Sequence, residues 1–407
     1  MEYYTNGDHS ANLLAYKNGA KPRIYIGDSD FLATYKTTGD VTGYGLNDAI
    51  IGGHVDMSIG THAQLGGVVT SELELKLAKN LISDNIKNQL FHKNSANKLY
   101  IYFGIGADQA TESVMALDDF FSVIETPVQG RDTITVHGYG GAHMLDTRFD
   151  PSKSFDCLNG ETLINFLANS TATDHRTTKI IDCIAETAGI ACTANFNFSY
   201  EPNYGQGGFF ETDKNYTCRD IVEWFCEYYA CYASVVMRIE YSHGESDYMI
   251  TPTLEFNRFD WTGNTDEFWQ IQNIINMDVS RLDIRCCGIC ITYKGTEYYC
   301  THPSLLSDNR YNNVYVRIKN DANIFYKLMT WQERQNITVY LYGDDQYKLK
   351  TTPAFKITVA SGFVYEVGQP RNFIDHEGVQ RSGTITHVTY NFGGTTLLEC
   401  DTGFGNI

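Results

Sequence analysis

The chain has few prolines, few cationic residues and no long apolar run, and each shortage excludes a class of protein. Its 407 residues include 8 prolines, and 31 lysines and arginines stand against 49 aspartates and glutamates, a formal net charge of −18. Since no Lys/Arg run is present, the charge argues against specific nucleic-acid binding and against adsorption to anionic membranes. No run of roughly 18 apolar residues exists, so we expect no transmembrane helix and no stable membrane anchoring.

The sequence also lacks a secretion signal and the cysteine pattern of a disulfide framework. The first ten residues, MEYYTNGDHS, contain neither a basic segment nor an apolar one, so we expect no signal peptide. Eleven cysteines is an odd number for a disulfide framework, and Cys183, Cys226 and Cys231 all lie in apolar patterns. We therefore expect reduced, buried thiols.

What the chain does have is aromatic and apolar residues in abundance. Hydrophobic residues make up 43% of the sequence, with 28 tyrosines, 22 phenylalanines and 35 glycines. This is enough to bury sizeable cores, which excludes disorder, and the length predicts two or three domains. Aromatics with frequent glycine and little proline favour many short strands joined by tight turns.

The segment from Thr217 to Ile239 predicts a capped helix that runs into a strand. Thr217 is a candidate N-cap, and Asp220 three residues later completes a weak capping box. One helical face is predicted to hold Cys218, Ile221, Val222, Phe225 and Tyr229. After Ala230 the apolar residues alternate, which is typical of a half-buried strand.

A second helix is predicted over Thr178 to Gly189, with Gly189 as its C-cap and a strand after it. Its sequence pattern is similar to that of the Thr217–Ile239 segment, which lies 41 residues further along the chain. The two helix–strand units are therefore expected to pack as a small α+β module. A short helix is predicted around Leu163, and a helix or extended turn over Ile324 to Arg334. Predicted strands are Ala49–Ile59, Ser71–Leu81, Lys98–Gly104, Phe120–Thr126, Asp132–Tyr139, Leu282–Tyr293, Val314–Ile318, Ile337–Leu341, Phe355–Val359 and Thr384–Tyr390.

These elements predict a mainly β protein with an α+β insert. We expect two barrel-like β domains, at residues 1–155 and 266–407, on either side of an α+β domain at 156–265.

Two motifs have the spacing of binding sites. The first, Gly104-Ile-Gly106, follows a strand but lacks the third glycine and the helix of a dinucleotide loop. The second is a cysteine cluster in which Cys287 and Cys290 have zinc spacing and Cys300 with His302 could complete the set. The alternating strand pattern from Cys286 favours buried structural cysteines over a metal site.

No catalytic motif is present. His137 and His143 flank a GYGG turn with Asp146 and Asp150 nearby, but no HExxH and no GxSxG occur. No paired carboxylates stand out beyond Asp118-Asp119, and the sequence suggests no specific histidine partner for Cys157. We assign no catalytic, cofactor-binding or metal residues and expect the protein not to be an enzyme.

Three stretches resemble parts of the baseplate hub (tail hub) proteins of bacteriophages and related contractile particles. The first is the helix–strand segment, whose Thr-aromatic-Arg-Asp start has Cys218 in place of the aromatic residue. The second runs from Phe120 to Ser152, where Gly140 replaces the usual Asp, so no role of that carboxylate is carried over. Its matching positions are Ile134, Val136, Tyr139, Met144, Leu145, Asp146, Phe149, Pro151 and Ser152.

The third stretch, Val364 to Glu399, has a turn at Asp375 to Gly378 followed by the strand Gly383 to Val388. The resemblance implies a structural homotrimer whose paired barrel-like domains form a pseudo-sixfold ring between a sixfold tail tube and a threefold central spike. Tube, spike and other baseplate subunits would be its partners. It implies synthesis in the cytoplasm of a bacterial host and a place in a virion tail or tail-like particle, with DNA passing through the lumen. No wall-degrading extension is expected after Ile407.

Two other hypotheses stay open. Abundant aromatics on an acidic chain also suit a β-rich tail protein that binds a host receptor or cell-wall carbohydrate. A cell-wall hydrolase built around Cys157 is the third hypothesis. The sequence does not distinguish a phage from a bacteriocin or another injection particle.

Overall fold

The computed structural model is mainly β with one α+β segment, which confirms the fold class predicted from the sequence. It describes residues 3–5, 23–27, 44–46, 48–59, 66–91, 100–105, 113–116, 121, 126–149, 176–194, 215–229, 231–241, 248–258, 270–279, 286–301, 314–319, 355–360 and 365–401. Among these residues, no helix has both the length and the apolar character needed to cross a membrane.

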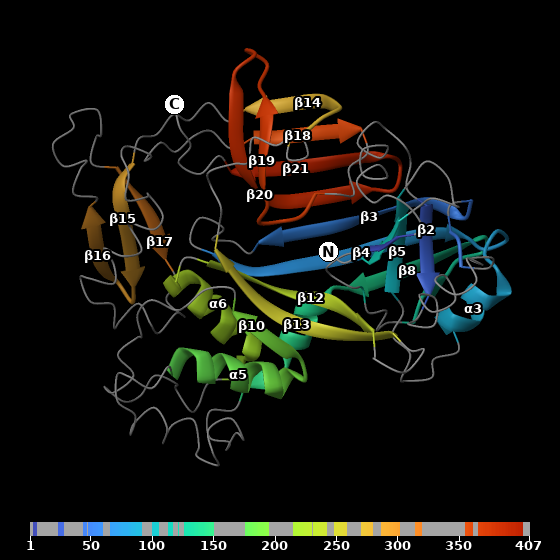
Figure 1. The fold of residues 1–407 in the computed structure, drawn as a ribbon, viewed down its shortest axis with the longest axis horizontal. Coiled ribbons are helices and arrows are strands. Elements are labelled where there is room, and N and C mark those ends of the chain that lie inside the picture. Colours follow the sequence, from blue (N-terminus) through green and yellow to red (C-terminus); the bar gives the residue numbers. More distant parts are fainter. Residues whose placement is uncertain are drawn as a thin grey trace.

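A sheet of twelve strands dominates the molecule (Figure 1). Its main path runs β10-β13-β12-β4-β3-β20-β21-β18-β14, with β19 beside β20, β8 beside β4 and β7 beside β8. The strands are β3 (Ile50–Ile59), β4 (Gly67–Ala78), β7 (Val128–Gln129), β8 (Thr133–Tyr139), β10 (Ala191–Ala194), β12 (Cys231–Tyr241), β13 (Tyr248–Arg258), β14 (Ile274–Val279), β18 (Phe355–Ala360), β19 (Pro370–Ile374), β20 (Gln380–Asn391) and β21 (Thr395–Asp401).

The long strand β4 holds this sheet together. One of its edges pairs with β3 along most of its length. The other edge is shared, because β12 pairs in parallel with Gly67 and Val68 while β8 pairs antiparallel from Glu72 to Ala78. The sequence pattern explains why β4 can do this: Leu73, Leu75 and Leu77 are buried and the residues between them are exposed.

The first and last parts of the chain meet in the middle of the sheet. Strand β20 pairs antiparallel with β3, so Val388 lies opposite Met57 and Tyr390 opposite Val55. One apolar core runs beneath both parts and includes Leu75, Val388 and Leu398. The predicted division into three domains stays a prediction, and hydrogen-bonded pairing links strands from all three predicted ranges.

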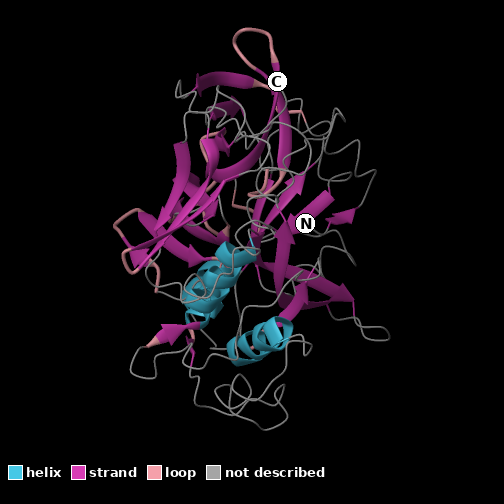
Figure 2. Cartoon of the chain, turned by 90° about the vertical axis from the view of Figure 1, so that its left-hand side faces the viewer, coloured by secondary structure: helices cyan, strands magenta, loops and turns pink. Residues whose placement is uncertain are grey.

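Two helix–strand units form the predicted α+β module. Helix α5 (Arg176–Ala188) leads into β10, and helix α6 (Cys218–Tyr229) leads into β12; the two strands flank β13, parallel and antiparallel to it respectively. Gly189, with φ +70°, ends α5 as predicted. Figures 1 and 2 show both helices at the same end of the molecule. Nearly every face of α6 is buried, including Trp224 and Tyr228 outside the predicted apolar face.

Smaller elements surround the sheet. A four-stranded sheet has the order β1-β6-β5-β2, a three-stranded one the order β16-β15-β17, and β9 pairs with β11. Their bounds, with those of the remaining helices, are β1 (Tyr3–Thr5), β2 (Arg23–Gly27), α3 (Asp84–Phe91), β5 (Tyr100–Ile105), β6 (Ser113–Ala116), the 3₁₀ helix η1 (Gly141–Asp146), β9 (Arg148–Phe149), β11 (Tyr216–Thr217), β15 (Cys286–Tyr293), β16 (Thr296–Thr301) and β17 (Val314–Lys319).

Most of the predicted strands are confirmed, with bounds that shift by a few residues. The strand predicted over Phe120 to Thr126 is wrong at both described positions, because Phe121 and Thr126 lie in no strand. Phe121 is nevertheless buried against Gly138 of β8, which accounts for its apolar pattern. The helix near Leu163, the element at 324–334 and the strand at 337–341 fall outside the described residues.

The cysteine prediction holds for some residues and fails for one. Cys226 and Cys231 are free and buried, as expected. Cys183, also expected to be a free thiol, forms a disulfide. The apolar pattern around Cys183 is that of the buried face of α5, and a half-cystine satisfies this pattern as well as a thiol does.

The turn between β19 and β20 is held by one carboxylate. Asp375 Oδ1 accepts hydrogen bonds from the backbone N–H groups of Glu377 (2.9 Å) and Val379 (2.8 Å), and Oδ2 accepts one from Arg381 Nε (2.9 Å). Gly378 has φ +79°, which this tight turn requires. Burial raises the pKa of Asp375, but these hydrogen bonds outweigh burial and hold its pKa below the ordinary value.

Replacing Asp375 with alanine is expected to lower the free energy of unfolding by about 2 kcal/mol, because two backbone N–H groups and Arg381 lose a charged acceptor. Urea unfolding at neutral pH measures this. A lowered folded pKa also means that the contribution is present above pH 3.8 and is lost as the pH falls below it. Asp375→Asn, which keeps Oδ1, should lose less than the alanine variant; equal losses would mean that the backbone bonds contribute nothing.

Candidate functional site

Two of the family-like stretches, far apart in the sequence, meet at one place. Strand β9 pairs with β11, so Phe149 lies opposite Tyr216 and Arg148 opposite Thr217. The N–H of Cys218 donates to the carbonyl of Thr147 at 2.9 Å. We call the meeting of η1 and β9 with β11 and the start of α6 the η1–α6 junction.

The start of α6 forms the predicted capping box. The Asp220 carboxylate accepts hydrogen bonds from the backbone N–H of Thr217 (2.7 Å) and from its hydroxyl (2.9 Å). In return, the N–H of Asp220 donates to Thr217 Oγ1 at 3.2 Å. These bonds satisfy donors that a helix start leaves open, and they fix where α6 begins.

Between the capping residues lies Arg219, which ties α6 to η1. Its Nη2 donates to Asp146 Oδ2 at 2.9 Å and to the carbonyl of Ala142 at 3.0 Å, while Nε lies 2.8 Å from Asp146 Oδ1. The Arg219 side chain is 24% exposed and that of Asp146 55% exposed, so water screens the pair from one side. Of the positions that resemble the hub family, Asp220 thus bonds to the N-cap residue Thr217, and Arg219 bonds to Asp146.

Arg219→Ala is expected to lower the free energy of unfolding by about 2 kcal/mol, because the Ala142 carbonyl and Asp146 both lose a charged donor. Asp146→Asn, at the more exposed partner, should cost about 0.5 kcal/mol. Urea unfolding of the two single variants and the double variant measures both the costs and the coupling. If Arg219→Ala matched the wild type, the junction would not stabilise the fold.

Several carboxyl groups surround this single arginine. Burial raises the pKa of Glu223 on α6 to about 7, Arg219 opposes the shift, and the charges of Asp220, Glu227 and Asp146 add to it. Glu227, one turn further along α6, is buried. These carboxyl groups surround Arg219 at the start of α6, and none of them lines the cavity between β3, β4, β12 and β13. They therefore belong to the junction.

The two predicted histidines do not form a catalytic pair with Asp146. His137 lies on β8 opposite Glu74 of β4. The Nδ1 of His143 lies 2.6 Å from the carbonyl oxygen of Gly140, and because a carbonyl only accepts, Nδ1 carries the proton and donates. Asp146 is engaged by Arg219. A hydrolytic role for this group has no support in the geometry.

The cysteine cluster is spread along a strand ladder. Cys290 is buried and lies opposite Tyr299 of β16 and Arg317 of β17, whereas Cys300 lies opposite Ile289. The Nη1 of Arg317 donates to Cys290 Sγ at 3.7 Å. Within the described part of the chain, no group of three or more His, Cys, Asp or Glu is arranged to hold a metal ion.

Another polar cluster, which the sequence did not suggest, spans β3 and β20. Asp56 Oδ1 lies 2.7 Å from His387 Nε2 and accepts a hydrogen bond from Thr389 Oγ1 at 2.7 Å. A nucleophilic triad needs the hydroxyl to donate to a basic imidazole nitrogen. Thr389 Oγ1 lies 3.3 Å from His387 Nε2 but donates its proton to Asp56, and Nε2 faces the same carboxylate oxygen. The group is therefore a cross-strand ladder rather than an activated nucleophile.

The remaining predicted candidates, Asp118, Asp119, Asp150, Cys157, Gly106 and His302, lie outside the described residues. The sequence also missed the partner of Arg219, since 73 residues separate it from Asp146. The only signal that could have joined them was their membership of two stretches that resemble the same family.

The fold and the junction define a class: a mainly β protein with an α+β module and no assembled catalytic group among its described residues. No protein-family model matches the chain, and no curated protein matches it. Solved structures do. The 43 kDa tail protein of prophage MuSo2 from Shewanella oneidensis has a TM-score of 0.49 and 12% identity, over 95% of this chain and 100% of that one.

Two further solved structures are similar to the chain. The prophage tail protein gp18 from Listeria monocytogenes EGD-e has a TM-score of 0.42 and 12% identity, over 94% of this chain and 95% of that one. A chain of the Francisella PdpA-VgrG complex has a TM-score of 0.42 and 9% identity, over 94% of this chain and 58% of that one. The first two of these structures are phage tail proteins, the kind of protein that the sequence resembles. All three TM-scores are below 0.5, so this likeness by itself assigns no function to the chain.

Proposed function

We propose that the chain is a structural hub subunit of a phage tail or contractile injection particle, forming a ring between tail tube and central spike. The observation that carries the proposal is the η1–α6 junction. Residues that match the hub family in two separate stretches, Asp146 and Arg219 among them, bond to each other. Polar residues used in this way build a scaffold, whereas catalytic residues face a cleft.

Symmetry gives the ring its physical purpose. A homotrimer whose subunits each present two related β domains offers six similar edges to a sixfold tube and three identical ones to a spike. Strand edges between subunits would be buried in such a ring, which removes a site of aggregation. The net charge of −18 suits a lumen through which DNA passes without adhering.

Within this proposal the protein is not an enzyme. It is made in the cytoplasm of a bacterial host, becomes part of the virion tail or tail-like particle, and contacts tube, spike and other baseplate subunits. The three predicted domains supply the ring and its α+β insert.

Assembly of particles from variant chains tests the proposal. We expect His137→Ala, His143→Ala and Cys287→Ala to leave the number of complete tails seen by electron microscopy unchanged, because none of them is assigned a chemical role. A variant that folds normally but yields no particles would contradict a purely structural role for that residue.

A second candidate function, carbohydrate binding, is favoured by one surface cluster. Tyr299 on β16 is 43% exposed, its ring lies 5.0 Å from that of Tyr315, and the guanidinium of Arg317 lies 5.8 Å from its centre. Exposed tyrosine and arginine are typical of recognition surfaces. Binding to host-wall glycans on an array, lost in Tyr299→Ala, would favour this function; a blank array would leave the hub as the better account.

A further inference from the structure

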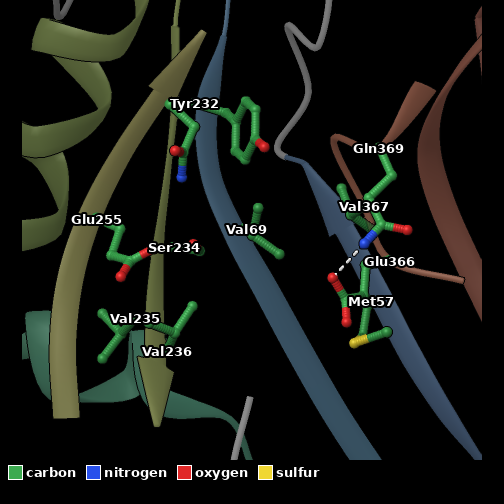
Figure 3. A pocket seen from close by; sticks show the side chains of 11 residues that line it. Met57, Val69, Tyr232, Ser234, Val235, Val236, Glu255, Glu366, Val367 and Gln369 are labelled. Carbon is green, nitrogen blue, oxygen red and sulfur yellow. Dashed lines mark hydrogen bonds between the residues drawn. The ribbon is translucent and has the colours of Figure 1, made fainter. Parts of the chain in front are cut away.

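A cavity of about 210 Å³ opens where the α+β module meets the strands from both ends of the chain. Its walls come from β3, β4, β12, β13 and the segment before β19 (Figure 3). The cavity forms because β4 and β12 pair only at Gly67 and Val68 and then diverge. None of its lining residues belongs to the η1–α6 junction, so a ligand could bind here whether or not the protein is a hub subunit.

The walls of the cavity carry carboxylates, apolar side chains and neutral polar groups. Glu255 of β13 and Glu366, on opposite sides of the opening in Figure 3, supply carboxylates. The apolar part of the wall consists of Met57, Val69, Val235, Val236 and Val367. Ser234, Tyr232, Asn257 and Gln369 add neutral hydrogen-bonding groups, and none of the described residues that line the cavity is a lysine, arginine or histidine.

The two carboxylates differ in their surroundings. Glu255 is only 8% exposed. Glu366 accepts a hydrogen bond from Gln369 Nε2. Burial lowers the pKa of Arg371, and the nearby charge of Glu366 opposes that shift.

One rim of the cavity is fixed by a close backbone contact. Gly368 has φ +88°, and a Cβ there would lie 2.4 Å from Cζ of the Tyr232 ring. Only glycine permits this conformation and this approach. The segment carrying Glu366 and Gln369 is thereby held against β12, so the wall is formed before any ligand arrives.

Size and chemistry together select the ligand class. Pockets for drug-sized ligands and cofactors have volumes of about 300 to 1,000 Å³, so this cavity suits a smaller group. Carboxylates beside valine and methionine match a cation on an apolar stem. We propose that the cavity binds an alkylammonium group, with the stem against Val69 and Val367 and the ammonium between Glu255 and Glu366. A lysine side chain of another protein and a free aliphatic diamine are the two sources of this chemistry.

Titration calorimetry on the full chain tests the proposal with n-butylammonium as the probe and n-butanol as its uncharged match. We expect n-butylammonium to bind and n-butanol not to. Glu255→Gln and Glu366→Gln should each weaken binding at least tenfold, whereas Glu72→Gln, at an exposed position of β4, should leave it unchanged. Circular dichroism confirms that each variant is folded, and Glu366→Gln provides the test if Glu255→Gln does not fold.

Two further probes distinguish the sources. Binding of Nα-acetyl-lysine methylamide but not of cadaverine would assign the cavity to a protein side chain, and the reverse to a free diamine. The proposal is overturned if n-butylammonium gives no heat of binding, if n-butanol binds equally well, or if both glutamine variants bind it as the wild type does.

Discussion

Replacing Gly66 with alanine is expected to lower the free energy of unfolding by about 4 kcal/mol or more, or to prevent folding. Gly66 has φ +124°, a conformation that residues with a Cβ rarely adopt. A Cβ there would lie 1.8 Å from the carbonyl oxygen of Cys231 and 2.8 Å from that of Cys226. Since both contacts are with backbone, α6 or the start of β12 would have to move away from β4.

Gly394 provides a matched control, because it has φ +98° but nothing lies within 4 Å of its Cβ position. Gly394→Ala should therefore show the conformational cost alone, about 1 to 3 kcal/mol. Urea unfolding of the two variants separates the cost of the backbone conformation from the cost of the steric clash at Gly66. If Gly66→Ala were no less stable than Gly394→Ala, the close approach of β4 to the α+β module would be absent in solution.

Glu223→Gln is expected to stabilise the protein at pH 8 and to make little difference at pH 4. Burial raises the folded pKa of Glu223 to about 7, above the ordinary 4.5. The folded chain therefore holds a proton that the unfolded chain releases, so the contribution to stability is full below pH 4.5 and is lost as the pH rises through 7. At about 1.4 kcal/mol per pKa unit, the gain in the variant above pH 7 should be about 1 to 3 kcal/mol.

Urea unfolding between pH 4 and 8 measures this effect. The control is Glu186→Gln, at an exposed position of α5, which should change the pH profile little. Parallel profiles for the wild type and Glu223→Gln would mean that Glu223 is not partly buried as the structure places it. A stabilised variant would also show that the carboxyl cluster around Arg219 costs stability near neutral pH.

Local features were predictable from the sequence because their causes lie within one or two turns of chain. Thr217 and Asp220 cap α6 through bonds across three residues, and Gly189 ends α5 where its conformation is required. The alternation of Leu73 and Leu75 with exposed residues identified β4 and its buried face. The mainly β class followed from many such short patterns.

Long-range pairing was not predictable because nothing local specifies it. Asp56 and His387 lie 331 residues apart yet join β3 to β20, and Arg219 finds Asp146 across 73 residues. The shared edge of β4 depends on the path of β12, and so does the cavity beside it. Spacing along one sequence carries no record of these partners.

The assembly state of the purified chain tests the hub account most directly. Native mass spectrometry with negative-stain class averages measures both mass and symmetry. The account predicts a species of three 45.9 kDa chains and a ring with a central hole and threefold or apparent sixfold symmetry. A chain that stays monomeric at every concentration, also when mixed with the tube and spike proteins of its particle, would contradict the account.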